Sequence, residues 1–98
     1  MKPPIVRPAA AADIDDAYRW YERQQVGLGE EFLAAASAVM KSVVANPLLF
    51  PIIHRQTRRA LFHRFPYGLF YRIVEDQIVV VGCVHARRDP RRWQSRQS

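Results

Sequence analysis

The chain has 98 residues, of which 49% are hydrophobic and 24% charged, as in a globular protein rather than a disordered one. No apolar run approaches the roughly 20 residues that span a bilayer, and residues 1–8 lack the apolar segment of a signal peptide. Cys83 is the only cysteine, which excludes an internal disulfide and a cysteine zinc site. We therefore expect one domain over residues 1–98, in the cytoplasm, with no membrane association, metal or cofactor.

The net charge of +6 is unevenly distributed along the chain. Residues 1–53 carry five Lys or Arg and six acids, whereas residues 54–98 carry ten arginines and three acids. A positive field of this kind attracts nucleic acid or an acidic protein. An arginine-rich genome accounts for arginine in place of lysine, but it does not account for the one-sided placement.

The N-terminal half predicts a short strand followed by two helices. Residues 5–7 form the strand candidate, which Pro8 ends. Residues 10–25 favour a helix because one apolar stripe has helical spacing, namely Ile14, Ala17, Tyr18 and Tyr21. We expect Asp13 to lie in an early turn of this helix, where a carboxylate complements the helix dipole. A second helix is expected over residues 29–45, and the short linker predicts an antiparallel helical hairpin.

The C-terminal half predicts strands and a basic tail. Residues 48–53 are expected to form a proline-bounded loop, followed by strands over residues 58–65, 69–74 and 78–84. Alternation along the first of these strands places Phe62 and Phe65 on opposite faces, and the adjacent Phe70 and Tyr71 must also face opposite ways. The order β-α-α-β-β-β predicts an α+β fold, in which the hairpin packs on one face of a small, mainly antiparallel sheet. Residues 87–98 form the tail.

Several short motifs follow one another along the chain. They are Trp20-Tyr21, Gly27-Leu28-Gly29, Glu31-Phe32-Leu33, Asn46-Pro47, Arg64-Phe65-Pro66-Tyr67-Gly68-Leu69-Phe70-Tyr71-Arg72 and His85-Ala86-Arg87-Arg88-Asp89-Pro90-Arg91-Arg92-Trp93. Their order and spacing resemble the RelE/ParE superfamily of bacterial toxins over about residues 4–93. The resemblance implies the toxin of a type II toxin–antitoxin system, neutralised by a cognate antitoxin that is encoded beside it.

The resemblance leaves two activities open, because ParE-like toxins poison DNA gyrase whereas RelE-like toxins cut mRNA on the ribosome without a metal. Cleavage by a 2′-hydroxyl needs an acid and a base, together with cations for the charged phosphorane. His85 is the acid–base candidate, and its cationic partners would be Arg64, Arg72 and Arg88. The candidates for binding a phosphate or the target are Arg58, Arg59, Arg87 and Arg88, since guanidinium groups bind phosphate through two hydrogen bonds.

The β half departs from the RelE-type pattern. It contains no lysine, and no tyrosine follows Tyr71. We therefore favour gyrase inhibition over a metal-independent mRNA endonuclease, with a third alternative in which the chain binds an antitoxin but is not toxic. Trp20 and Tyr21 are expected in the core between helix and sheet or, where exposed, as anchors for an acidic antitoxin or for the target. Cys83 is expected to be buried and unreactive.

Overall fold

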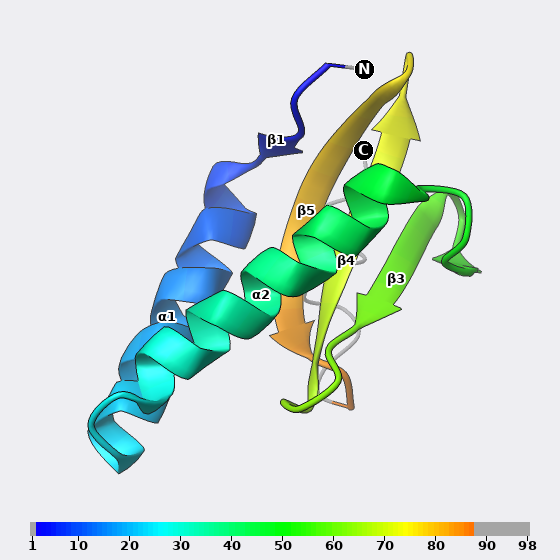
Figure 1. The fold of residues 1–98 in the computed structure, drawn as a ribbon. Helices are drawn as coiled ribbons and strands as arrows, with labels where there is room; N and C mark the ends of the chain where they lie inside the picture. Colours follow the sequence, from blue (N-terminus) through cyan, green and yellow to red (C-terminus); the bar gives the residue numbers. More distant parts are fainter. Residues whose placement is uncertain (1, 88–98) are drawn as a thin grey trace.

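Two helices cover one face of a five-stranded sheet in the computed structural model, which describes residues 2–87 (Figure 1). Helix α1 spans Pro8–Gln24 and helix α2 spans Leu28–Ala45. The strands are β1 (Ile5–Val6), β2 (Ile52–His54), β3 (Thr57–Leu61), β4 (Tyr67–Val74) and β5 (Gln77–His85). The predicted α+β class and helical hairpin are confirmed. Pro8 begins α1, because its fixed φ angle suits the first turn of a helix.

The sheet has the strand order β1-β5-β4-β3-β2. Every neighbouring pair is antiparallel except β1 and β5, which are parallel. A two-residue turn joins β4 to β5, and Glu75 and Asp76 have φ angles of 48° and 66°. Two consecutive positive φ angles are the mark of a type I′ turn, whose twist matches that of the strands it joins. The turn predicted at this point is therefore present.

Two differences from the predicted strands concern the segment after α2. Residues 52–54 were expected to lie in a loop or at its end, but they form β2 at the edge of the sheet. The strand expected over residues 58–65 ends at Leu61 as β3. The placement of Phe62 and Phe65 on opposite faces is therefore wrong, because both belong to the core beneath the helices. Alternation holds only while the backbone stays extended.

The main core lies between the helices and the sheet. Phe32 of α2 is fully buried at its centre, and its ring contacts those of Tyr21, Phe62, Phe65 and Tyr67 at centroid distances of 5.1–5.4 Å. A second cluster occupies the other face of the sheet and contains Phe70, Val79, Val81 and Val84. Tyr71 belongs to the first cluster and Phe70 to the second, so the prediction that they face opposite ways is confirmed.

The turn between the helices is held by the side chain of Glu22. Its carboxylate accepts hydrogen bonds from the backbone N–H groups of Gly27, at 3.0 and 3.2 Å, and of Gly29, at 2.9 Å. These groups lie at the N-terminus of α2, where N–H groups lack partners within the helix and a negative charge is stabilised. A Cβ atom on Gly29 would lie 2.8 Å from the carbonyl oxygen of Tyr18, so only glycine allows the helices this approach.

Candidate functional site

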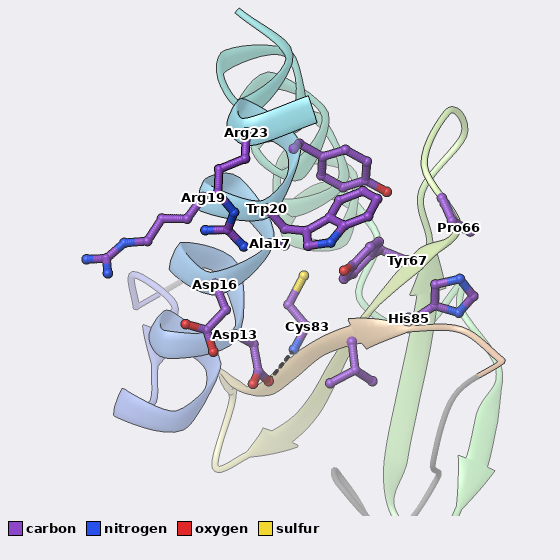
Figure 2. Close-up of a pocket in the computed structure, with 12 residues that line it drawn as sticks. Asp13, Asp16, Ala17, Arg19, Trp20, Arg23, Pro66, Tyr67, Cys83 and His85 are labelled. Carbon is purple, nitrogen blue, oxygen red and sulfur yellow. Dashed lines mark hydrogen bonds between the residues drawn. The ribbon is translucent and has the colours of Figure 1, made fainter. Parts of the chain in front are cut away.

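A cleft of about 670 Å³ lies between α1 and the C-terminal end of β5 (Figure 2). Helix α1 forms one wall, and the segments 66–67 and 83–85 form the other. The residues that line it are Asp13, Asp16, Ala17, Arg19, Trp20, Tyr21, Arg23, Pro66, Tyr67, Cys83, Val84 and His85. The cleft therefore combines aromatic rings with charged groups of both signs, and its volume is that of a typical ligand site.

Trp20 and Tyr21 have different environments on α1. Trp20 is 48% exposed and lies over the cleft, so the expectation that it belongs to the core is wrong. Tyr21 is half-buried, and its ring packs against those of Phe32 and Phe65. The two rings meet edge to face at a centroid distance of 5.0 Å. The exposed Trp20 ring, held in place by the Tyr21 ring, is therefore a candidate anchor for a partner protein.

His85 is half-buried at the end of β5, on the wall of the cleft opposite Trp20 (Figure 2). Its ring lies 5.7 Å from the ring of Tyr67, the residue paired with it on β4. Its Nδ1 atom accepts a hydrogen bond of 3.2 Å from the backbone N–H of Arg87. This hydrogen bond engages Nδ1 with the backbone of the chain itself.

Asp13 of α1 and Cys83 of β5 both line the cleft, and a hydrogen bond between them links the helix to the edge of the sheet. Strand β1 pairs only with Val79 and Val80, so the rest of β5 lies beside α1 instead of a strand. The buried Asp13 carboxylate accepts the backbone N–H of Cys83 at 3.0 Å, as Figure 2 shows. Helix α1 begins at Pro8, so Asp13 lies in its second turn, and the expectation of an early turn is confirmed. The expected burial of Cys83 is confirmed, with 1% of the residue exposed.

Burial makes Cys83 a poor nucleophile. The apolar surroundings raise the pKa of its thiol from 9.0 to about 12, and the nearby Asp13 carboxylate acts in the same direction. A thiol with such a pKa is protonated at neutral pH, and the thiolate is the reactive form. The cleft therefore offers binding groups and an imidazole, but no activated cysteine.

Arg64 and Arg58 lie on the other side of the helical hairpin from this cleft. Arg64 follows β3 and pairs with the carboxylate of Glu31 on α2, with its guanidinium 5.3 Å from the centroid of the Phe65 ring. It lines a separate groove of about 320 Å³, which His85 does not line. Arg58 donates hydrogen bonds from Nη1 to the carbonyl oxygens of Leu48 and Phe50, at 3.3 and 2.6 Å.

Arg59 and Arg72 share the face of the sheet that points away from the helices. Arg59 is paired with Phe70 and Arg72 with Val79, and both partners belong to the cluster on that face. Arg87 follows β5 and is exposed, whereas Arg88 and the rest of the basic tail lie outside the described residues. Within residues 2–87, the structure therefore does not gather His85, Arg64 and Arg72 around one point.

Other residues at these sites carry a weaker sequence signal. Asp13 has the same helical spacing as the buried Ala10 and Ala17, so this stripe could have revealed its burial. His63 was expected in a strand, but it lies in the loop after β3 and is exposed.

Of residues 2–87, no three His, Cys, Asp or Glu side chains are placed to hold a metal ion. Neither helix in this range combines the length and apolar character needed to cross a bilayer.

Comparisons with known proteins agree with this architecture. A family model described as "ParE toxin of type II toxin-antitoxin system, parDE" matches residues 5–90. A solved structure described as the chromosomal ParDE TA system from P. aeruginosa has a similar fold, with a TM-score of 0.67 and 20% sequence identity. The similarity covers 87% of this chain and 96% of the matched chain. No curated protein sequence gives a significant match.

Proposed function

Because the chain belongs to the ParE toxin family of type II toxin–antitoxin systems, we propose that it inhibits growth by binding DNA gyrase in the cytoplasm. A cognate antitoxin neutralises it. The choice of gyrase as the target rests on the position of His85, which lies away from Arg64 and Arg72, two of the cations that RNA cleavage would need beside it. The fold is shared by toxins of both activities, so the arrangement of the side chains has to decide.

Gyrase binding without hydrolysis fits the described side chains better than RNA cleavage does. A general acid or base must come within hydrogen-bond reach of the reacting group while cations contact the phosphate. Arg64 is engaged by Glu31 beside a different groove, and Arg72 is on the opposite face of the sheet from the helices. His85 is therefore left without these two cations, and RNA cleavage would need others.

The cleft beside α1 is the proposed antitoxin site. Trp20 supplies a large exposed ring, with Tyr21 and Tyr67 beside it. Arg19, which pairs with Asp15, and Arg23 lie at the same cleft. Aromatic and arginine side chains are the residue types that most often dominate protein interfaces. The net charge of +6 favours an acidic antitoxin segment. Trp20→Ala is expected to weaken antitoxin binding by about tenfold or more.

The target is tested by inducing the toxin in bacteria that lack the antitoxin. Incorporation of labelled thymidine and labelled methionine is followed over the first minutes, for the wild-type chain and for His85→Ala. We expect thymidine incorporation to stop first, with double-strand breaks, and His85→Ala to remain toxic, since binding gyrase does not use an imidazole for proton transfer. Thermal unfolding of the purified variant serves as the control for its fold.

Two results would contradict gyrase inhibition. If methionine incorporation stops first and His85→Ala abolishes this effect while keeping its fold, the chain acts on translation as a nuclease. If neither label is affected although soluble toxin accumulates, the chain binds an antitoxin without being toxic. Each result selects one of the alternatives that the sequence leaves open.

A further inference from the structure

The segment between α2 and β2 exposes two adjacent leucines. Leu48 is 72% and Leu49 is 73% exposed, and Pro47 and Pro51 flank this short apolar run. Apolar side chains this exposed usually occur singly on a protein surface, whereas these continue into Ile52 of β2, which is 54% exposed. We call residues 47–51 the leucine loop.

The backbone of the leucine loop is held by hydrogen bonds from the sheet. The buried Tyr71 hydroxyl donates to the carbonyl oxygen of Pro47 at 2.5 Å. Arg58 donates to the carbonyl oxygens of Leu48 and Phe50, and the N–H of Arg59 donates to that of Pro51 at 3.1 Å. The loop is thus preorganised, so a partner that binds it does not have to order it first.

A groove of about 320 Å³ adjoins the leucine loop between α2 and β3. Its lining is mostly apolar and consists of Ala35, Ala38, Val39, Ser42, Phe50, Leu61, His63 and Arg64. Phe50 belongs both to the loop and to the groove, and Leu61 is 50% exposed. The loop and the groove therefore form one continuous surface, in which projecting leucines stand beside a shallow apolar depression.

The stretch of sequence that forms this surface carries positive charge only. Residues 32–74, which include the leucine loop, β2, β3 and β4, contain no Asp or Glu. The same range contains Lys41 and five arginines, of which Arg59 and Arg72 lie on the face of the sheet that points away from the helices. Arg55 is exposed in the turn between β2 and β3. Glu31 is the nearest preceding acid in the sequence, and it pairs with Arg64. An acidic partner would therefore be attracted to the apolar surface by its surroundings.

We propose that the leucine loop is the docking site for the protein that the toxin attacks, at an acidic surface of that protein with an apolar pocket. Side chains that project from a held backbone fit a concave receptor, which we expect on a folded target rather than on an extended antitoxin segment. Nucleic acid fits less well, because a phosphate backbone gains nothing from two exposed leucines. This inference rests on the proposed toxin function, but not on gyrase being the target.

The test uses Leu48→Ser/Leu49→Ser, with Val26→Ser as its matched control. Val26 is 89% exposed in the turn between the helices, so the control also removes an exposed apolar side chain. Three quantities are measured for each full-length variant: growth inhibition without antitoxin, copurification with the cognate antitoxin, and affinity for the purified gyrase heterotetramer. We expect the double variant to lose toxicity, to retain the antitoxin and to bind gyrase at least about tenfold more weakly.

The control is expected to behave as wild type, and thermal unfolding should show that both variants fold. A double variant that remains toxic overturns the proposal, and so does one that loses the antitoxin along with toxicity. A similar loss of affinity for a single-stranded RNA oligonucleotide would assign the surface to nucleic acid and also overturn it. If the wild-type chain is toxic but does not bind gyrase, the choice of gyrase fails while the toxicity and antitoxin results still decide the docking site.

Arg58 is a positioning residue in this proposal, because it holds the loop rather than contacting the target. Arg58→Gln should weaken target binding by less than the double leucine variant. It should also speed hydrogen exchange at the N–H groups of the loop relative to their intrinsic rates, which the leucine substitutions should not do. Equal exchange rates in Arg58→Gln and the wild-type chain would overturn this role.

Discussion

Asp13 and Cys83 show at the scale of single residues how a helix can replace a strand. Strand β1 is too short to pair along all of β5, and the carboxylate of Asp13 accepts the N–H of Cys83 that lies beyond it. A buried N–H without an acceptor costs roughly 1–3 kcal/mol. The Asp13 carboxylate therefore provides the Cys83 N–H with an acceptor at the edge of the sheet. Helix α1 also covers this edge, to which another strand could otherwise add.

The buried thiol of Cys83 predicts a loss of stability in alkali. Its pKa is raised from 9.0 to about 12, so the unfolded chain loses this proton at a lower pH than the folded chain. The free energy of unfolding is unaffected by this group below pH 9. It should decrease as the pH rises from 9 towards 12, by at most about 1.4 kcal/mol per pH unit.

Urea unfolding of the wild-type chain and of Cys83→Ala between pH 7.5 and 10.5 measures this contribution. Burial also raises the pKa of Tyr71, which titrates in both proteins, so the difference between the two slopes isolates the thiol. We expect the slope above pH 9 to be shallower in Cys83→Ala. Parallel curves for the two proteins would show that the thiol titrates alike in the folded and unfolded chains.

The helical hairpin is the element that carries the cleft, since α1 supplies Trp20, Arg19 and Arg23. Its geometry depends on the turn between the helices, where the Glu22 carboxylate binds the N–H groups of Gly27 and Gly29. Gly27 has a φ angle of 90°, in the left-handed region that favours glycine. The turn therefore combines a conformational requirement with a side-chain cap from the preceding helix.

Removing this cap should destabilise the protein. Glu22→Ala leaves the first N–H groups of α2 without their acceptor, and we expect the free energy of unfolding to fall by about 1–2 kcal/mol. Glu22→Gln keeps one oxygen acceptor and should show a smaller loss. Gln24→Ala, an exposed position on the same helix, is the control in chemical denaturation. A loss in Glu22→Ala no larger than that in Gln24→Ala would argue against the capping role.

The whole molecule divides its charge between its two halves. Residues 1–53 supply strand β1 and the helical hairpin and are nearly neutral, whereas residues 54–98 carry most of the positive charge. Apolar burial contributes most to tight binding, while long-range charge mainly determines how fast partners meet. The same positive field should therefore act on an acidic antitoxin and on an acidic target.

The association rate with the antitoxin should consequently depend on salt. Raising NaCl from 50 to 300 mM shortens the Debye length to well below about 10 Å, and we expect the association rate constant to fall by about tenfold. The dissociation rate constant should change much less. Stopped-flow fluorescence of Trp20, measured in a Trp93→Phe variant because the chain has two tryptophans, follows both constants. An association rate independent of salt would contradict electrostatic attraction.

The fold class, the helical hairpin, the turn at Glu75-Asp76 and the burial of Cys83 could all be predicted from the sequence. These features depend on local signals, which are helical or alternating spacing, turn residues and uninterrupted apolar runs. The opposite placement of Phe70 and Tyr71 follows from the geometry of a strand alone. The order and spacing of the motifs also indicated the family, because these motifs are spread over nearly the whole chain rather than confined to one site.

The tertiary structure was needed to establish which side chains share a site. The sequence grouped His85 with Arg64 and Arg72, but their elements direct them to a cleft, a groove and the far face of the sheet. It also left Trp20 open between the core and an exposed anchor, and it treated the leucine loop as a connection. Contacts between residues distant in the chain depend on strand order and helix packing, and exposure depends on what covers a side chain. Neither long-range contacts nor side-chain exposure can be read from the local spacing of residues in the sequence.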